Sequence, residues 1–113
     1  MLLPKDTNAH GTIFGGVILS YIDLAGAVEA RRHTVHKVVT VALKEVIFQK
    51  PVFVGDVVSM FTSLVRLGTS SVTVQVDVEA RRDADPSEVV QVTTAKVVYV
   101  AVDAQGTKCA LEA

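Results

Sequence analysis

The sequence is poor in cysteine and in charge, and each shortage narrows the class of protein. Cys109 is the only cysteine among 113 residues, which excludes an intrachain disulfide framework and a cysteine-ligated metal site. There are 11 basic and 12 acidic residues, so no excess of charge draws the chain to nucleic acid or to an anionic membrane. No apolar run reaches the roughly 18 residues that a membrane-spanning helix needs.

Length and composition point to one cytoplasmic domain with a partner. The single cysteine makes a reducing, cytoplasmic setting the expected one. The first residues, MLLPKDTN, lack the basic start and the long apolar stretch of a secretory signal peptide. The length suits a single domain over residues 1–113. Half of the residues are hydrophobic, but only 20% are charged, which is a little below the share usual in soluble domains. We therefore expect another chain to cover part of the surface.

Residues 17–32 have the pattern of a helix that is apolar on more than one side. The stripes that we place on opposite sides are Ile18, Ile22, Ala25 and Glu29, and Leu19, Asp23, Gly26 and Ala30. The second stripe is hardly more polar than the first. A helix that is apolar on both sides is buried on both sides.

The rest of the chain has the pattern of β-strands separated by short turns. We expect strands over residues 37–51, 57–67, 71–80 and 89–103. The third alternates cleanly, as a half-buried antiparallel strand does, with these residues on one face: Val72, Val74, Val76 and Val78. One buried helix followed by four strands predicts an α+β domain, in which a curved antiparallel sheet wraps around a long central helix.

A sheet of this kind covers only one side of its helix. Because the helix is apolar on both sides, its other side needs a second copy of the chain. The sequence therefore predicts at least a homodimer.

Two features of the segment AHGTIFGGVILSYIDLAGA, residues 9–27, need a chemical explanation. Gly15 and Gly16 open the helix, although glycine costs roughly 1 kcal/mol relative to alanine in a helix. They could form a tight turn that permits close packing, or they could expose helix N–H groups to a ligand such as a thioester oxyanion. Asp23 could be solvated, could be a structural acid paired with an arginine of the partner, or could be a catalytic base or nucleophile. Its apolar helical neighbours argue against solvation.

The stretch DTNAHGTIFGGVILSYID, residues 6–23, closely resembles the opening motif of the hotdog-fold acyl-CoA thioesterases, which include YciA-like bacterial enzymes and brain acyl-CoA hydrolase. The resemblance continues through VTVALKEVIFQKPVFVGDVV, GTSSVTVQVDV and VYVAVDAQG, so it covers essentially the whole chain. It implies a hotdog fold, dimers that often form trimers of dimers, and hydrolysis of acyl-coenzyme A to free acid and coenzyme A without a metal or prosthetic group.

The same resemblance implies roles for individual residues. It places the catalytic carboxylate on Asp23, the backbone donor to the thioester carbonyl on Gly16, and a residue that orients the site or its water on Asn8. Residues expected to contact the substrate are Gly15, Thr12, Phe14, Thr40, Arg66, Thr69, Ser70 and Ser71. Candidates for binding the phosphates of coenzyme A are Arg31, Arg32, Lys50, Arg66, Arg81 and Arg82. No metal site is expected, because His10 has no second ligand at metal-binding spacing.

The chain departs from the family pattern in two places. Thr12 stands where many members have aspartate or asparagine. Members also usually have another strand before the opening motif, whereas only MLLP precedes it here. Either the sheet has one strand fewer or the sequence is a truncated form.

The spacing of the two implied catalytic residues bears on the assembly. Gly16 and Asp23 are seven residues apart, or about 10 Å along a helix. Both must lie within about 3–4 Å of one thioester carbonyl. One helix cannot easily supply both, whereas two antiparallel helices across a dimer can.

We therefore predict an acyl-CoA thioesterase. Asp23 either assists the attack of water or attacks directly to give an anhydride, while the Gly16 N–H polarises the thioester carbonyl; both routes fit these residues. Two other functions fit the fold: a dimer that binds acyl-CoA without turnover, and a dehydratase of hydroxyacyl thioesters. A dimer that only binds acyl-CoA would leave the presence of Asp23 and of the glycine pair unexplained. A dehydratase favours a histidine in the site, and His10 is the only histidine near the motif.

Overall fold

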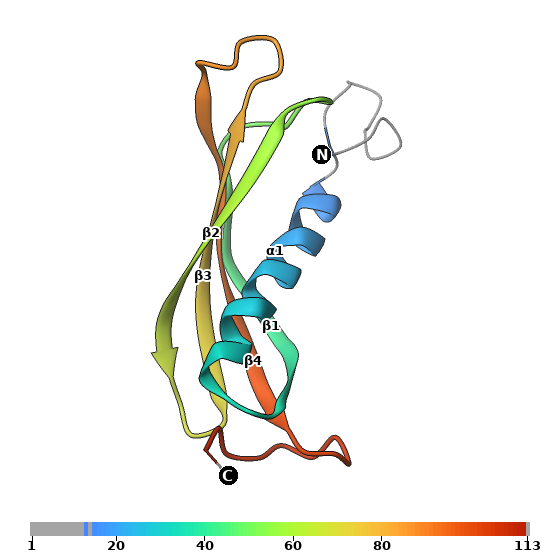
Figure 1. The fold of residues 1–113 in the computed structure, drawn as a ribbon, viewed down its shortest axis with the longest axis vertical. Coiled ribbons are helices and arrows are strands. Elements are labelled where there is room, and N and C mark those ends of the chain that lie inside the picture. Colours follow the sequence, from blue (N-terminus) through green and yellow to red (C-terminus); the bar gives the residue numbers. More distant parts are fainter. Residues whose placement is uncertain (1–12, 14, 113) are drawn as a thin grey trace.

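The computed structural model describes Ile13 and residues 15–112, which form a helix on one face of a four-stranded antiparallel sheet (Figure 1). The helix is α1, Gly15–Ala30, and a 3-10 turn, η2, Arg31–His33, follows it. The strands are β1, Lys37–Phe48; β2, Val57–Leu67; β3, Ser71–Arg81; and β4, Val89–Val102. The predicted α+β class is confirmed, and all four predicted strands are present; the first ends at Phe48 rather than at residue 51, and the third and fourth end within one residue of the prediction.

The helix begins and ends two residues earlier than predicted. The predicted helical pattern was counted from Val17, after the two glycines that open the segment, whereas in the structure Gly15 and Gly16 are the first two residues of α1. Arg31 and Arg32 belong to η2, the tighter turn in which helices often end. With 16 residues, α1 is too short to cross a membrane, and no other helix among the described residues is long and apolar enough.

The strand order of the sheet is β1-β4-β3-β2, so the first two strands of the sequence lie at opposite edges. Residues 49–56 carry the chain from one edge to the other. The central pair, β3 and β4, is in register over most of its length, with Val74 opposite Val97. The sequence did not predict this order, which brings β4 beside β1 and under α1.

The hydrophobic core lies between α1 and the inner face of the sheet. The four alternating valines of β3 are fully buried, which confirms the predicted inner face: Val72, Val74, Val76 and Val78. Ile18 and Ile22 of α1 pack against them. Burying side chains of this size stabilises a fold by roughly 1.5–3 kcal/mol each.

The predicted stripes of the helix were partly wrong. Gly26 and Ala30 are buried in the same row as Ile18 and Ile22, because residues four apart lie nearly above one another on a helix. The face that remains uncovered is apolar too. Tyr21 is 42% exposed, and Leu24 and Val28 are each 65% exposed. The helix is therefore apolar on two sides as predicted, but the two sides are differently composed.

The edge strand β1 extends this uncovered apolar surface. Val39 and Val41 are 45% and 56% exposed, and among the described residues no strand pairs with the outer side of β1. Figure 1 shows β1 running beside α1. A contiguous apolar surface over a helix and a free strand edge is typical of a protein interface.

Candidate functional site

Asp23 lies halfway along α1, where its side chain meets residues from both β1 and β4. Thr40 on β1 donates a hydrogen bond from Oγ1 to Asp23 Oδ1 over 2.6 Å. On β4, the Tyr99 hydroxyl lies 2.7 Å from the Asp23 backbone oxygen and 3.2 Å from Oδ1. Among the described residues of one chain, no cation forms an ion pair with Asp23, which is partly buried. Its Oδ1 is therefore held by neutral donors.

Tyr99 is a site residue that sequence reasoning missed. Its side chain is fully buried, and burial followed by the charge of Asp23 raises the pKa of the phenol far above its ordinary value. The phenol therefore keeps its proton and donates to Asp23. A signal was present in the sequence, because a tyrosine in the buried row of a valine-rich strand needs a partner for its hydroxyl.

Gly26, one turn after Asp23, makes room for the Tyr99 hydroxyl. A Cβ added at Gly26 would collide with that oxygen and would lie 3.1 Å from two ring carbons, Cε2 and Cζ. The glycine is required here for close approach, not for an unusual backbone angle.

We expect Gly26→Ala to lower the free energy of unfolding by about 1–3 kcal/mol, because a methyl group is forced into a packed site. Denaturant titration measures this loss. In a Tyr99→Phe background the colliding oxygen is gone, so the same substitution should cost less. An equal loss in both backgrounds would show that the Tyr99 hydroxyl is not the obstacle.

The N-terminal turn of α1 is open at Gly16. The first backbone N–H groups of a helix have no partner within the helix, and the first turn of α1 contains no acidic side chain. A Cβ at Gly16 would meet no described atom within 4 Å. Gly15 is closer to the sheet, since its Cβ would lie 3.3 Å from Cζ of Phe48. Among the described residues, no side chain therefore occupies the space beside the Cβ position of Gly16.

The two implied catalytic residues, Gly16 and Asp23, lie on the same helix, two turns apart. The structure confirms that one continuous helix carries both. Since about 10 Å of helix separates them, a single chain does not bring them to one carbonyl.

Two of the predicted substrate contacts line one hollow. Arg66 and Thr69 line a space of about 560 Å³ beside the β2–β3 turn, together with His33, Leu67, Gly68, Ala110, Leu111 and Glu112. His33 follows the C-terminal end of α1, so this hollow lies at the opposite end of the helix from Gly16. Ser70 and Ser71, which were also predicted to contact the substrate, make backbone hydrogen bonds at the β2–β3 turn. The Ser70 carbonyl accepts from the Ala101 amide, and that of Ser71 accepts from Gly68.

The structure changes the list of basic residues available to a phosphate. Arg82 donates to Asp56 over 2.8 Å and to the Pro51 carbonyl over 2.8 Å, and only 11% of its side chain is exposed. Arg82 was a candidate for binding the phosphates of coenzyme A, but its guanidinium is already hydrogen-bonded to Asp56 and Pro51. Arg66 is exposed.

Three predicted site residues, Asn8, Thr12 and Phe14, lie outside the described residues, and their roles stay predictions. In the described part, no group of three or more histidine, cysteine, aspartate or glutamate side chains is placed to hold a metal ion. The chemistry that the described site offers is therefore that of a carboxylate and of backbone donors.

Comparison with protein families gives a match over most of the chain. The model described as the thioesterase superfamily matches residues 10–87. The acyl-CoA thioester hydrolase YciA of Escherichia coli strain K12 is 39% identical over 113 residues, which cover 98% of this chain and 86% of that protein.

Solved structures agree with this comparison. A hexameric hotdog-fold thioesterase of Campylobacter jejuni superposes with a TM-score of 0.92 at 42% identity, over 98% of this chain and 85% of that one. An acyl-CoA hydrolase of Staphylococcus aureus, described in complex with butyryl coenzyme A and coenzyme A, gives a TM-score of 0.89 at 29% identity, over 99% and 68%.

Proposed function

The chain belongs to the thioesterase superfamily as one of its hotdog-fold, YciA-like acyl-CoA thioester hydrolases, and we propose that Asp23 and Gly16 are the two catalytic groups of that hydrolysis. The observation that carries this proposal is the position of the Asp23 carboxylate. Thr40 and Tyr99 both lie at Oδ1, whereas no described residue donates to Oδ2. The carboxylate is held in one orientation with one oxygen free to react.

The proposed reaction uses the free oxygen of Asp23 and the open turn at Gly16. Oδ2 takes a proton from a water molecule as its oxygen attacks the thioester carbon, or Oδ2 attacks that carbon directly and water then cleaves the anhydride. In both routes the carbonyl oxygen becomes an oxyanion, which the Gly16 N–H stabilises. In the first route the C–S bond then breaks, and the coenzyme A sulfur takes up the proton that Asp23 accepted. In the second route the C–S bond breaks as the anhydride forms, the sulfur leaves as a thiolate, and the water that later cleaves the anhydride supplies the proton and restores the Asp23 carboxylate. The products are a free carboxylic acid and coenzyme A.

The proposal includes an assembly of at least two chains, each a single domain over residues 1–113. The uncovered apolar surface of α1 and β1 supports it, because a second copy would bury Leu24 and Val28. The hexameric state of the Campylobacter jejuni relative supports a trimer of such dimers. In the dimer, Gly16 of one chain faces Asp23 of the other. We keep the cytoplasmic location expected from the single cysteine.

We also propose where the substrate lies. The acyl-CoA thioester sits between Gly16 of one chain and Asp23 of its partner, and its phosphates lie in the hollow with Arg66 and Thr69. The exposed guanidinium of Arg66 supports this, because arginine is suited to bind phosphate. The butyryl coenzyme A complex of the Staphylococcus aureus relative supports a substrate of this class.

Mixing two inactive variants tests the shared site. Gly16→Val and Asp23→Asn subunits, each inactive alone, are unfolded together, refolded and assayed for thiol release from acyl-CoA. A mixed dimer has one site with both substitutions and one site with neither. We expect about a quarter of the wild-type activity to return, because half of the dimers are mixed and each has one intact site.

The matched control for this experiment is a mixture of each variant with itself, treated identically, which should stay inactive. If the mixed sample also stays inactive although mass spectrometry shows mixed dimers, the two residues do not act across the interface. A protein that light scattering shows to be a stable monomer of 12.1 kDa would contradict both the dimer and the shared site.

A further inference from the structure

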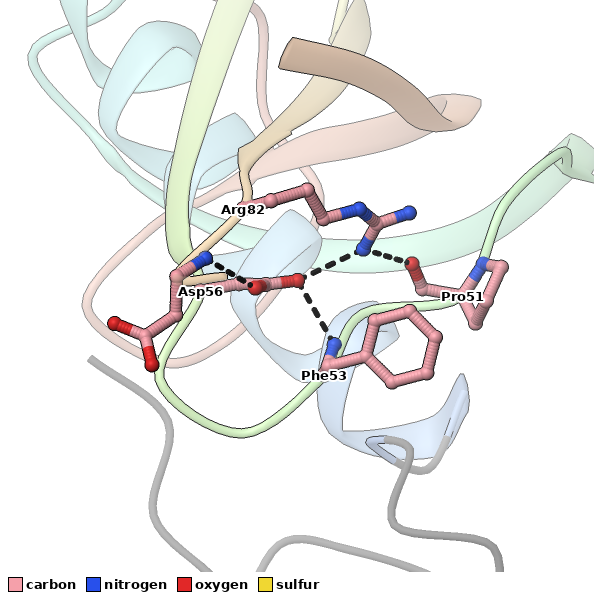
Figure 2. Close-up of polar contacts among 5 residues, drawn as sticks. Pro51, Phe53, Asp56 and Arg82 are labelled. Carbon is pink, nitrogen blue, oxygen red and sulfur yellow. Dashed lines mark hydrogen bonds and ion pairs between the residues drawn. The ribbon is translucent and has the colours of Figure 1, made fainter. Parts of the chain in front are cut away.

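A buried ion pair joins two loops that meet at one end of the sheet (Figure 2). Asp56, in the β1–β2 connection, is 2% exposed and accepts a hydrogen bond from Arg82, which follows β3, over 2.8 Å. The same Asp56 oxygen accepts from the Phe53 amide over 2.9 Å, and the other oxygen accepts from the Asp83 amide over 3.0 Å. The carboxylate is thus satisfied on both oxygens.

Arg82 holds the β1–β2 connection at two further points. Its guanidinium donates to the Pro51 carbonyl over 2.8 Å and stacks over the Phe53 ring, 4.8 Å from the ring centre. Figure 2 shows Pro51 and Phe53 converging on Arg82 together with Asp56. We call these four residues the Asp56–Arg82 clamp. It fixes the residues on both sides of Val52.

Val52 connects the clamp to the catalytic helix. Its side chain is 2% exposed, and its carbonyl accepts a hydrogen bond from the Ile13 amide over 2.8 Å. Ile13 stands two residues before Gly15, the first residue of α1. Ile13 and Gly15 line a hollow of about 400 Å³, which Pro51 and Val52 also line. The hydrogen bond from Ile13 thus ties Val52 to a residue two positions before the first turn of α1.

The chemistry of the clamp favours precise placement over added stability. Burial raises the pKa of the Asp56 carboxyl, but hydrogen bonds from the Phe53 and Asp83 amides and from Arg82 outweigh burial, so the pKa lies below its ordinary value and the group stays charged. A buried ion pair often stabilises a fold no more than apolar residues of the same volume, because both charges lose their water. Hydrogen bonds in fixed directions do, however, specify one geometry.

We propose that Asp56 and Arg82 are positioning residues of the thioesterase, which act through Val52 and Ile13 to hold the Gly16 N–H at the place where the oxyanion forms. This inference rests on the proposed role of Gly16. A displacement of about 1 Å in a catalytic group can lower a rate a hundredfold. The clamp therefore affects the chemical step more than the binding of substrate.

Asp56→Asn tests the clamp. It keeps the size of the side chain but replaces one carboxylate oxygen by an NH₂ group, so that one of the three groups that donate to Asp56 then faces another donor. We expect kcat to fall by about tenfold to a hundredfold and KM to change much less, at a temperature where the variant is fully folded. Arg82→Lys keeps the charge but loses the planar guanidinium that stacks over the Phe53 ring, and we expect a smaller fall in kcat. The matched control is Lys96→Met, which removes an ion pair of the same 2.8 Å length with Glu45 on the outer face of the sheet and should leave kcat nearly unchanged.

A double-mutant cycle separates positioning from general stability. In a Gly16→Val background, where the donor is already blocked, Asp56→Asn should lower kcat little further. In a Thr40→Val background it should lower kcat by the same factor as in the wild type. A variant that melts at a lower temperature with unchanged kcat, or equal effects in both backgrounds, would overturn the proposed clamp. If instead Gly16→Val is itself fully active, the assignment of the donor is wrong, and that result is seen without any clamp variant.

Discussion

Replacing Asp23 by asparagine is expected to abolish acyl-CoA hydrolysis and to leave the fold intact. Asparagine keeps an oxygen that can accept from Thr40 and Tyr99, so the contacts of Oδ1 survive. What is lost is the basic oxygen that takes the proton or attacks the carbonyl. Since a positioned base contributes about 10²–10⁴-fold, turnover should fall by at least that factor. The release of coenzyme A thiol from a panel of acyl-CoA substrates, butyryl-CoA included, measures the loss.

Asp77→Asn is a matched control for this substitution. Asp77, on the outer face of the sheet, also accepts a hydrogen bond from a threonine, Thr94, over 2.9 Å, and it is also partly buried. Its variant should retain full turnover.

Stability separates the catalytic role of Asp23 from a structural one. Removing the acid of a buried ion pair strands a cation and destabilises a protein strongly, whereas a carboxylate held by neutral donors can be neutralised at little cost. We expect the melting temperature and the oligomeric mass of Asp23→Asn to match those of the wild type. A variant that melts several degrees lower and still hydrolyses acyl-CoA would show that Asp23 is a structural acid.

Replacing Gly16 by valine is expected to lower turnover by about 10²–10³-fold, the usual effect of losing one oxyanion donor. Among the described residues of one chain, the structure shows no steric obstacle to the first side-chain carbon of this substitution. A Cβ at Gly16 meets no described atom within 4 Å. Valine is also no worse than glycine in a helix. The added methyl groups would instead occupy the path by which the thioester oxygen reaches the N–H.

A series at the same position tests this interpretation of Gly16. Gly16→Ala places a single methyl group there and should lose less activity than Gly16→Val, while thermal melting of both variants stays close to that of the wild type. Normal hydrolysis by a folded Gly16→Val enzyme would mean that the start of α1 has only a structural role.

The sequence by itself located the elements, and it predicted, from the two apolar sides of the helix, an assembly of at least two chains. Helical and strand periods are local properties, so α1 and the four strands could be located from residue patterns alone. The spacing of Gly16 and Asp23 is equally local, and it already favoured two helices for one carbonyl if both residues are catalytic. The family was recognisable for the same reason, because its opening motif is one continuous stretch of the chain.

Only the tertiary structure decided which residues surround the carboxylate. Thr40 and Tyr99 are 17 and 76 residues from Asp23, and they meet it because β4 pairs with β1 beneath α1. Arg82 was considered for a phosphate on the strength of its charge, yet it lies against Asp56, 26 residues away. Strand order and register bring such partners together, and no local pattern specifies them, because a strand with one apolar face fits beside many others.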